Sequence, residues 1–151
     1  MNITGAFTTA TPVGGLRALG SRAELLEQVS TLRDVRAGGA DVVHAVFLPV
    51  IALGRIPLAT TITTLEESET GARLRVTGRR GVQLVDVDLR LEFAAERDRT
   101  TVTWQAEVVV RGNAASVGQR VARDIAARAI GDVLAEAAAV AGEVTVTGPL
   151  L

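Results

Sequence analysis

Apolar and polar residues alternate with a period of two over residues 82–93, which is the clearest strand pattern in the chain. Similar patterns cover residues 2–9, 31–37, 40–48, 57–68, 72–80 and 101–110. The apolar positions of the two strongest segments are each expected to share one face of a strand: Val85, Val87, Leu89, Leu91 and Phe93 in the first, and Val102, Trp104, Ala106, Val108 and Val110 in the second. The short turns between the last six segments predict antiparallel neighbours in one sheet.

A helical period replaces this alternation at residues 113–141, the only long helix pattern in the chain. Asn113 is placed to cap its first turn, because its side-chain oxygen can accept from an unpaired backbone N–H. The apolar side of this helix is broad but consists mainly of small residues, including Gly118, Ala122 and Ala126. A helix of this kind can lie across a sheet and leave a cavity beneath it.

Two weaker helical patterns, at residues 12–19 and 21–29, follow the first strand, and Ser21 and Glu24 have the spacing of a capping box. The order of elements predicts an α+β helix-grip fold. We expect a curved, seven-stranded antiparallel sheet wrapped around the long C-terminal helix, with two short helices after the first strand. Residues 1–142 are expected to form a single ligand-binding domain, and residues 143–151 a short tail.

The space between sheet and helix is the expected ligand site. We expect it to be lined by inward-facing residues of the strands and of the helix. The candidate ligand-binding residues are His44, Val46, Leu48, Leu58, Ile62, Leu74, Val76, Val87, Leu89, Trp104, Val108, Val117, Gly118, Val121 and Ile125. Trp104 is expected to belong to the core, with stacking on a flat ring at the cavity mouth as the alternative, and Gly118 could serve either close packing of a strand or space for a ligand.

His44 is the one candidate with a titratable side chain. Its register with Val46 and Leu48 predicts the inner face, where it could donate a hydrogen bond to the polar head of a ligand. The alternative is a core histidine bonded to backbone, or one at a wet edge. In the same strand, at residues 40–48, this register directs Val43, Ala45 and Phe47 outward. These three apolar residues could form a partner or dimer surface.

Composition excludes several classes of function. The net charge of -1 and the pI near 5.9 argue against a nucleic-acid partner. The chain has no Cys and a single His, which argues against disulfides, thiolate chemistry and histidine metal clusters. No pair of carboxylates is placed to converge, so we expect no enzyme and no metal.

The basic stripe Arg73, Arg75 and Arg79 faces acidic residues of the next strand, and we expect ion pairing there rather than an anionic partner.

No signal-peptide pattern is present at the N-terminus, and the longest apolar run, residues 45–53, is shorter than the roughly 20 residues of a membrane span. A cytoplasmic protein is therefore expected.

Three stretches, NITGAFTTATP, GRIPLATTITTLEE and RGNAASVGQRVARDIA, resemble the carbon monoxide dehydrogenase G-subunit family. This family belongs to the START-like, polyketide-cyclase-like superfamily, which includes Bet v 1-like proteins. The resemblance covers residues 1 to about 141 and is most specific over residues 115–120. It implies a non-enzymatic carrier or accessory protein of a carbon monoxide dehydrogenase-type system, holding a lipid or an isoprenoid quinone, with a dehydrogenase partner and transient contact with the inner membrane face. An adaptor without a ligand, or a cyclase-like enzyme, are the alternatives.

Overall fold

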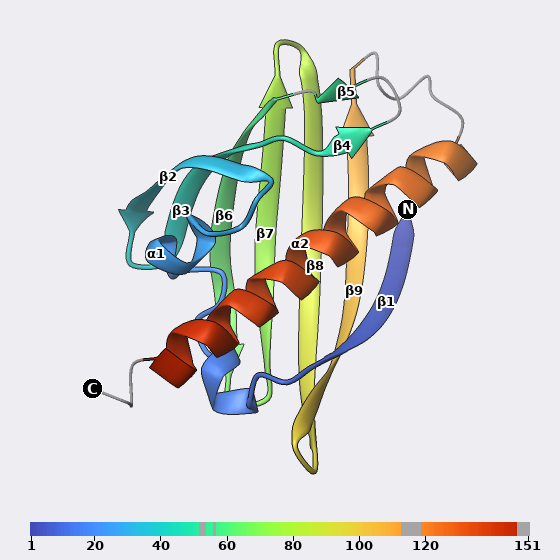
Figure 1. Ribbon diagram of the computed structural model, residues 1–151. Helices are drawn as coiled ribbons and strands as arrows, with labels where there is room; N and C mark the ends of the chain where they lie inside the picture. Colours follow the sequence, from blue (N-terminus) through green and yellow to red (C-terminus); the bar gives the residue numbers. More distant parts are fainter. Residues whose placement is uncertain (52–53, 56, 113–118, 148–151) are drawn as a thin grey trace.

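Seven antiparallel strands form one sheet in the order β1-β9-β8-β7-β6-β3-β2 (Figure 1). The computed structural model describes residues 1–51, 54–55, 57–112 and 119–147, and for residues 50–51, 54–55, 119–122 and 144–147 it describes the backbone alone. The strands are β1 (Asn2–Thr9), β2 (Leu32–Gly39), β3 (Val42–Phe47), β6 (Leu58–Ser68), β7 (Gly71–Arg80), β8 (Gln83–Glu96) and β9 (Arg99–Arg111). The predicted seven-stranded antiparallel sheet is confirmed. A further pair, β4 (Val50–Ile51) with β5 (Gly54–Arg55), forms a small second sheet that the sequence pattern does not predict.

The long helix α2 (Gln119–Thr147) crosses one face of the sheet diagonally, which confirms the helix-grip fold (Figure 1). It continues past Ala141, so the first part of the predicted tail is helical rather than irregular. The predicted cap Asn113 lies outside the described residues.

The two short helices follow β1, as expected, but they are shorter than the pattern suggests. They are the 3-10 turn η1 (Val13–Leu16) and α1 (Ala23–Leu26). The predicted capping box is wrong: α1 has Arg22 at its N-cap position, with no side-chain capping bond. The hydroxyl of Ser21 donates instead to the carbonyl of Ala18, 3.3 Å away, in the preceding turn.

Two apolar clusters hold the helix on the sheet. The first surrounds Trp104, which is 4% exposed and lies between β1 and α2. Glycine is required on the β1 side, because a Cβ atom at Gly5 would lie 2.6 Å from Nε1 of Trp104. On the helix side, a Cβ atom at Gly131 would lie 3.7 Å from the indole ring, which is an ordinary van der Waals contact. The second cluster joins α1, β2 and β3 to the C-terminal half of α2 and includes Val43.

Polar contacts fix the same C-terminal half of the helix. The hydroxyl of Thr11 donates to the carbonyl of Ala138, 2.6 Å away, and Gly142 leaves the space that this side chain occupies. The backbone N–H and the hydroxyl of Ser30 both donate to the carboxylate of Glu136, at 2.8 and 2.9 Å. The helix is therefore anchored at its C-terminal half.

The Thr11 anchor is testable by the change Thr11→Val, which keeps the shape of the side chain and removes its hydroxyl. The backbone carbonyl of Thr11 also accepts from the buried hydroxyl of Thr100 at 2.7 Å, so this site has little access to water. We expect the free energy of unfolding to fall by about 1–2 kcal/mol, measured by urea denaturation. Thr103→Val, at an exposed position of β9, is the matched control and should change stability by less than about 0.5 kcal/mol. Equal losses in the free energy of unfolding for the two variants would show that the Thr11 hydroxyl does not stabilise the position of the helix.

Charged residues occupy the outer face of the sheet, as the alternation predicts. The guanidinium of Arg73 binds the carboxylate of Asp88 through two hydrogen bonds, Nε to Oδ1 at 3.1 Å and Nη2 to Oδ2 at 2.8 Å. This pair confirms cross-strand ion pairing for part of the basic stripe. The hydrogen bonds from Arg73 hold the pKa of Asp88 below its usual value.

Asp88 should therefore contribute to the pH dependence of stability. A carboxyl group whose pKa is lowered on folding stabilises the folded state above the pKa of the unfolded chain. That contribution is lost as the pH falls through the lower, folded-state pKa. We expect Arg73→Gln to raise the pKa of Asp88 toward its ordinary value, as measured by NMR titration of the side-chain carboxyl. An unchanged titration curve would show that the ion pair is not populated in solution.

Candidate ligand-binding cavity

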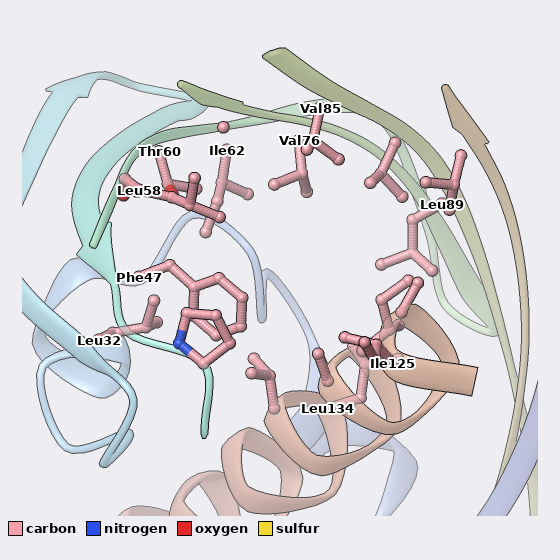
Figure 2. Close-up of a pocket in the computed structure, with 18 of the residues that line it drawn as sticks. Leu32, Phe47, Leu58, Thr60, Ile62, Val76, Val85, Leu89, Ile125 and Leu134 are labelled. Atoms are coloured by element: carbon pink, nitrogen blue, oxygen red, sulfur yellow. Dashed lines mark hydrogen bonds between the residues drawn. The ribbon is translucent and has the colours of Figure 1, made fainter. Parts of the chain in front are cut away.

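A cavity of about 360 Å³ lies between the sheet and the N-terminal half of α2 (Figure 2). Figure 2 shows side chains of the sheet, such as Ile62, Val76 and Leu89, directed toward Ile125 and Leu134 of the helix. The lining residues are Met1, Leu26, Leu32, Phe47, Pro49, Leu58, Thr60, Ile62, Val76, Gly78, Val85, Val87, Leu89, Val108, Val110, Ile125, Ala126, Ala129, Ile130, Val133 and Leu134.

The cavity arises from the sizes of the side chains that face each other. Toward one end of the sheet, large residues such as Trp104, Leu91 and Phe93 fill the space beneath the helix. Toward the other end, β7 contributes Gly78 and the helix contributes Ala129, with valines on the neighbouring strands. The side chains of the two layers leave this part of the interior unfilled. The core is therefore packed at one end of the sheet and hollow at the other.

Among the described residues that line the cavity, Thr60 alone has a polar side chain. Its hydroxyl donates to the carbonyl of Leu58, 2.9 Å away, so its proton is already used within the protein. None of these described lining side chains is titratable. These side chains have no group that could transfer a proton or pair with a buried charge. The cavity suits an apolar molecule, and its volume lies within the range of about 300–1,000 Å³ typical of small-molecule sites.

Residues 35–142 match the protein-family model that describes the G subunit of carbon monoxide dehydrogenase (CoxG). The chain belongs to the CoxG family. No curated protein matches the chain significantly.

Solved structures agree with the fold of this CoxG-family chain. A conserved protein from Geobacillus kaustophilus is similar with a TM-score of 0.78 at 18% identity, over 91% of this chain and 93% of that one. A START superfamily protein from Mycobacterium smegmatis is similar with a TM-score of 0.71 at 11% identity, over 95% and 98%. Ara h 8.0201 is similar with a TM-score of 0.61 at 13% identity, over 91% and 95%. These likenesses show a START/Bet v 1-like fold.

Seven of the predicted ligand-binding residues line the cavity of this CoxG-family chain: Leu58, Ile62, Val76, Val87, Leu89, Val108 and Ile125. Leu48, Leu74 and Trp104 are buried in the packed interior and do not line it. Val117 and Gly118 lie outside the described residues, and Val121 lies in α2 at a position whose side chain is not described.

The predicted faces of β3 are wrong. Val43 and Ala45 are buried in the second cluster and Phe47 lines the cavity, whereas His44 and Val46 lie on the outer face. Nδ1 of His44 is 3.1 Å from the hydroxyl of Thr61, on the outer side of β6. The apolar patch that was expected on the outer face of β3 is therefore absent. The expectation of a partner or dimer surface on this strand loses its basis.

The error has an identifiable cause in the sequence. Both faces of β3 carry apolar residues, so alternation alone does not distinguish them. Pairing with β6 does, because directly opposite residues of antiparallel strands share a face. Phe47 is opposite Leu58 and Val43 is opposite Ile62, and both partners face inward. This pairing is the signal that could have placed Phe47 in the cavity wall.

Several other lining residues were missed because they come from distant parts of the chain. Leu26 belongs to α1, Leu32 begins β2, and Pro49 follows β3. Their approach to the cavity depends on how the sheet curls, which local periodicity does not encode. The apolar periodicity places Val85, Val110 and Ala126 on the inward faces of their elements but does not indicate that they line the cavity.

Among the described ranges, no group of three His, Asp or Glu side chains is placed to hold a metal ion. Within the same part of the chain, no helix is both long enough and apolar enough to cross a membrane.

Proposed function

We propose that this protein binds an apolar small molecule, a lipid or an isoprenoid quinone, in the cavity between the sheet and α2. The observation that carries this proposal is the cavity of about 360 Å³, whose described wall has a single polar side chain. Membership of the CoxG family supports a role as a carrier or accessory protein of a carbon monoxide dehydrogenase-type system.

Burial of the ligand would supply the affinity. At about 25 cal/mol per Å² of apolar surface removed from water, a few hundred Å² contribute several kcal/mol before the costs of ordering. At about 30 Å³ for each water-sized group, the cavity holds on the order of a dozen non-hydrogen atoms. That is enough for a substituted ring or part of an acyl chain. A longer tail or a polar head would remain at the mouth, because the described walls have no partner for it.

Two alternatives fit the cavity less well. An adaptor without a ligand has no need of a hollow interior, and the hollow lowers stability because the atoms around it lose packing contacts. A cyclase-like enzyme needs polar groups beside its substrate, and in the described wall Thr60 alone offers a weak one.

Native mass spectrometry of gently purified protein tests the proposal, followed by thermal denaturation with a short-chain quinone or a medium-chain fatty acid. We expect a co-purifying apolar molecule and a rise in Tm that saturates with ligand. His44→Ala should retain both results, since His44 lies on the outer face. Bare protein whose Tm does not respond to any lipid or quinone would contradict the carrier function and favour the adaptor.

A further inference from the structure

A second pocket, of about 620 Å³, lies on the outer face of the sheet, on the side away from α2. We call it the outer pocket. In contrast to the apolar cavity, it is lined mainly by polar side chains, which come from the five neighbouring strands β2, β3, β6, β7 and β8. Its ionisable residues are Asp34, Arg36, His44, Arg79 and Asp86. The function proposed for the apolar cavity uses none of them.

The register of the sheet brings polar residues of the outer pocket into one row. Arg36 is opposite His44, and His44 is opposite Thr61. The row continues from Thr61 through Thr77 to Asp86. Because directly opposite residues of antiparallel strands share a face, all five side chains belong to the outer face of the sheet.

Ala59 of β6 forms the floor of the outer pocket. In the next row it lies between Val46 of β3 and Arg79 of β7, both of which have larger side chains. Since β6 is the middle strand of the five, the longer side chains of its neighbours surround this methyl group. The outer pocket is therefore the place where a small residue interrupts a surface of larger ones.

The imidazole ring of His44 forms one side of the outer pocket and is fixed by two contacts. Its Nδ1 atom is 3.1 Å from the hydroxyl oxygen of Thr61. Its Nε2 atom lies over Gly38, where a Cβ atom would be only 2.5 Å away. The ring can occupy this position because residue 38 has no side chain.

Strand β2 is bulged beside the outer pocket. The register shifts between Arg33 and Arg36, and Asp34 within the bulge has a φ of 52°, in the left-handed region that non-glycine residues seldom adopt. Bulges re-aim side chains, and backbone strain of this kind concentrates at functional sites. Here the bulge brings Asp34 and Arg36 to the same pocket.

The arginines of the outer pocket are not neutralised by carboxylates. The ion pairs in the described part of the chain involve other residues, so Arg36 and Arg79 have no carboxylate partner there. Arg79 differs in this respect from Arg73 of the same basic stripe, which binds Asp88. Two guanidinium groups beside one pocket are therefore available to bind an anion.

The carboxylates of the outer pocket stand at its edges. Adjacent strands are about 4.8 Å apart, so Asp34 in β2 and Asp86 in β8 are each about 10 Å from the middle strand β6. Their short side chains do not span that distance. Arg79 comes from the strand next to β6, and the longer side chain of Arg36 can extend past His44. The floor is therefore reached by basic groups and not by acidic ones.

We propose that the outer pocket binds the phosphate group of a small molecule over Ala59, between the guanidinium groups of Arg36 and Arg79. A guanidinium group donates two parallel hydrogen bonds to an oxyanion. The two oxygens of a carboxylate are matched by one such group, whereas a phosphate has enough oxygens for two. The sheet separates this site from the apolar cavity, so neither proposal depends on the other.

NMR titration with inorganic phosphate tests the site. His44 is the only histidine, so its ring signals report on the outer pocket without overlap from another imidazole. Sodium phosphate is exchanged for sodium chloride at constant pH and ionic strength. We expect a saturable shift of the imidazole signals with phosphate, and binding of acetate at least about fivefold weaker, because acetate engages one guanidinium group. Equal binding of acetate and phosphate would overturn the assignment to phosphate.

Arg79→Gln should weaken phosphate binding at least about fivefold, because charge-assisted hydrogen bonds are lost. The matched control is Arg75→Gln, the same change on the same face of β7 but outside the pocket. It should bind phosphate within about twofold of the parent protein, since salt screens the more distant charge. Equal losses in the two variants would show a general effect of surface charge and overturn the site, as would a shift that never saturates.

Ala59→Glu gives an independent test. Ala59 is exposed, so the fold tolerates a longer side chain there, and its carboxylate would occupy the floor and repel phosphate. We expect no saturable shift, with the circular dichroism spectrum of the parent protein. Phosphate binding retained by this variant would overturn the site. Both variants should show the same Tm response to a short-chain quinone as the parent protein, because Ala59 and Arg79 do not line the apolar cavity.

Discussion

Replacing Trp104 by alanine is expected to lower the free energy of unfolding by about 3–5 kcal/mol, the largest effect of any single change considered for this protein. The indole ring is 4% exposed and fills the space between Gly5 on β1 and Gly131 on α2. Neither glycine can extend a side chain into the space left behind, so the cavity created by the change would not collapse. Because Trp104 is the only tryptophan, the measurement should follow urea denaturation by circular dichroism rather than by fluorescence.

Two comparisons make this prediction specific. Trp104→Phe keeps an aromatic ring in the site and should lose clearly less stability than the alanine variant. Gln105→Ala, at the next position on the exposed face of β9, should change stability by less than about 0.5 kcal/mol. A loss below about 1 kcal/mol in Trp104→Ala would show that the packed end of the core does not depend on this ring.

Ala129→Trp is expected to abolish ligand binding while the protein stays folded. Ala129 lines the cavity from the helix, and Gly78 of β7 and Val87 of β8 line it from the sheet. An indole ring at this position can enter an existing space, so it should cost little stability and can add apolar contacts. The ligand would then compete with a covalently attached side chain for the same volume. We expect the ligand-induced rise in Tm to disappear and no apolar molecule to co-purify.

The matched control is Ala139→Trp, the same change at an exposed position of the same helix. It should keep the Tm response of the parent protein, and both variants should show the circular dichroism spectrum of the folded chain. If Ala129→Trp showed the same rise in Tm as the parent protein at the same ligand concentration, the ligand would have to bind outside this cavity.

These two expectations describe opposite ends of one interior. Trp104 lies at the packed end, where large side chains meet glycines and stability is gained. Ala129 lies at the hollow end, where the unfilled space lowers stability because the lining side chains lose packing contacts. The polar anchors of Thr11 and Ser30 hold α2 at the packed end. The arrangement lets the helix stay in place over a cavity that the sheet does not fill.

Local periodicity is enough to determine the seven strands of the main sheet, their order relative to the helices, and the helix-grip fold, but not the short β4–β5 pair. The inward faces of β8 and β9 also follow from it, since Leu89, Phe93 and Trp104 are buried as the alternation indicates. These features depend on the period of the backbone and on one apolar face for each strand, both of which can be read over a few neighbouring residues. The small residues of α2 likewise predict a hollow beneath the helix, and the cavity at Ala126 and Ala129 agrees with that expectation.

Only the tertiary structure decided which face of β3 points inward and where along the helix the hollow lies. The face of β3 depends on its pairing with β6, because both faces of β3 are apolar and local alternation is ambiguous there. The position of the cavity depends on which side chains of α2 meet which side chains of the sheet, and that depends on the crossing angle and on the anchor at Thr11. The walls at Leu26, Phe47 and Pro49 come from segments that the curl of the sheet brings together. A one-dimensional pattern specifies which side of an element is apolar, whereas the partner of that side is specified only by packing in three dimensions.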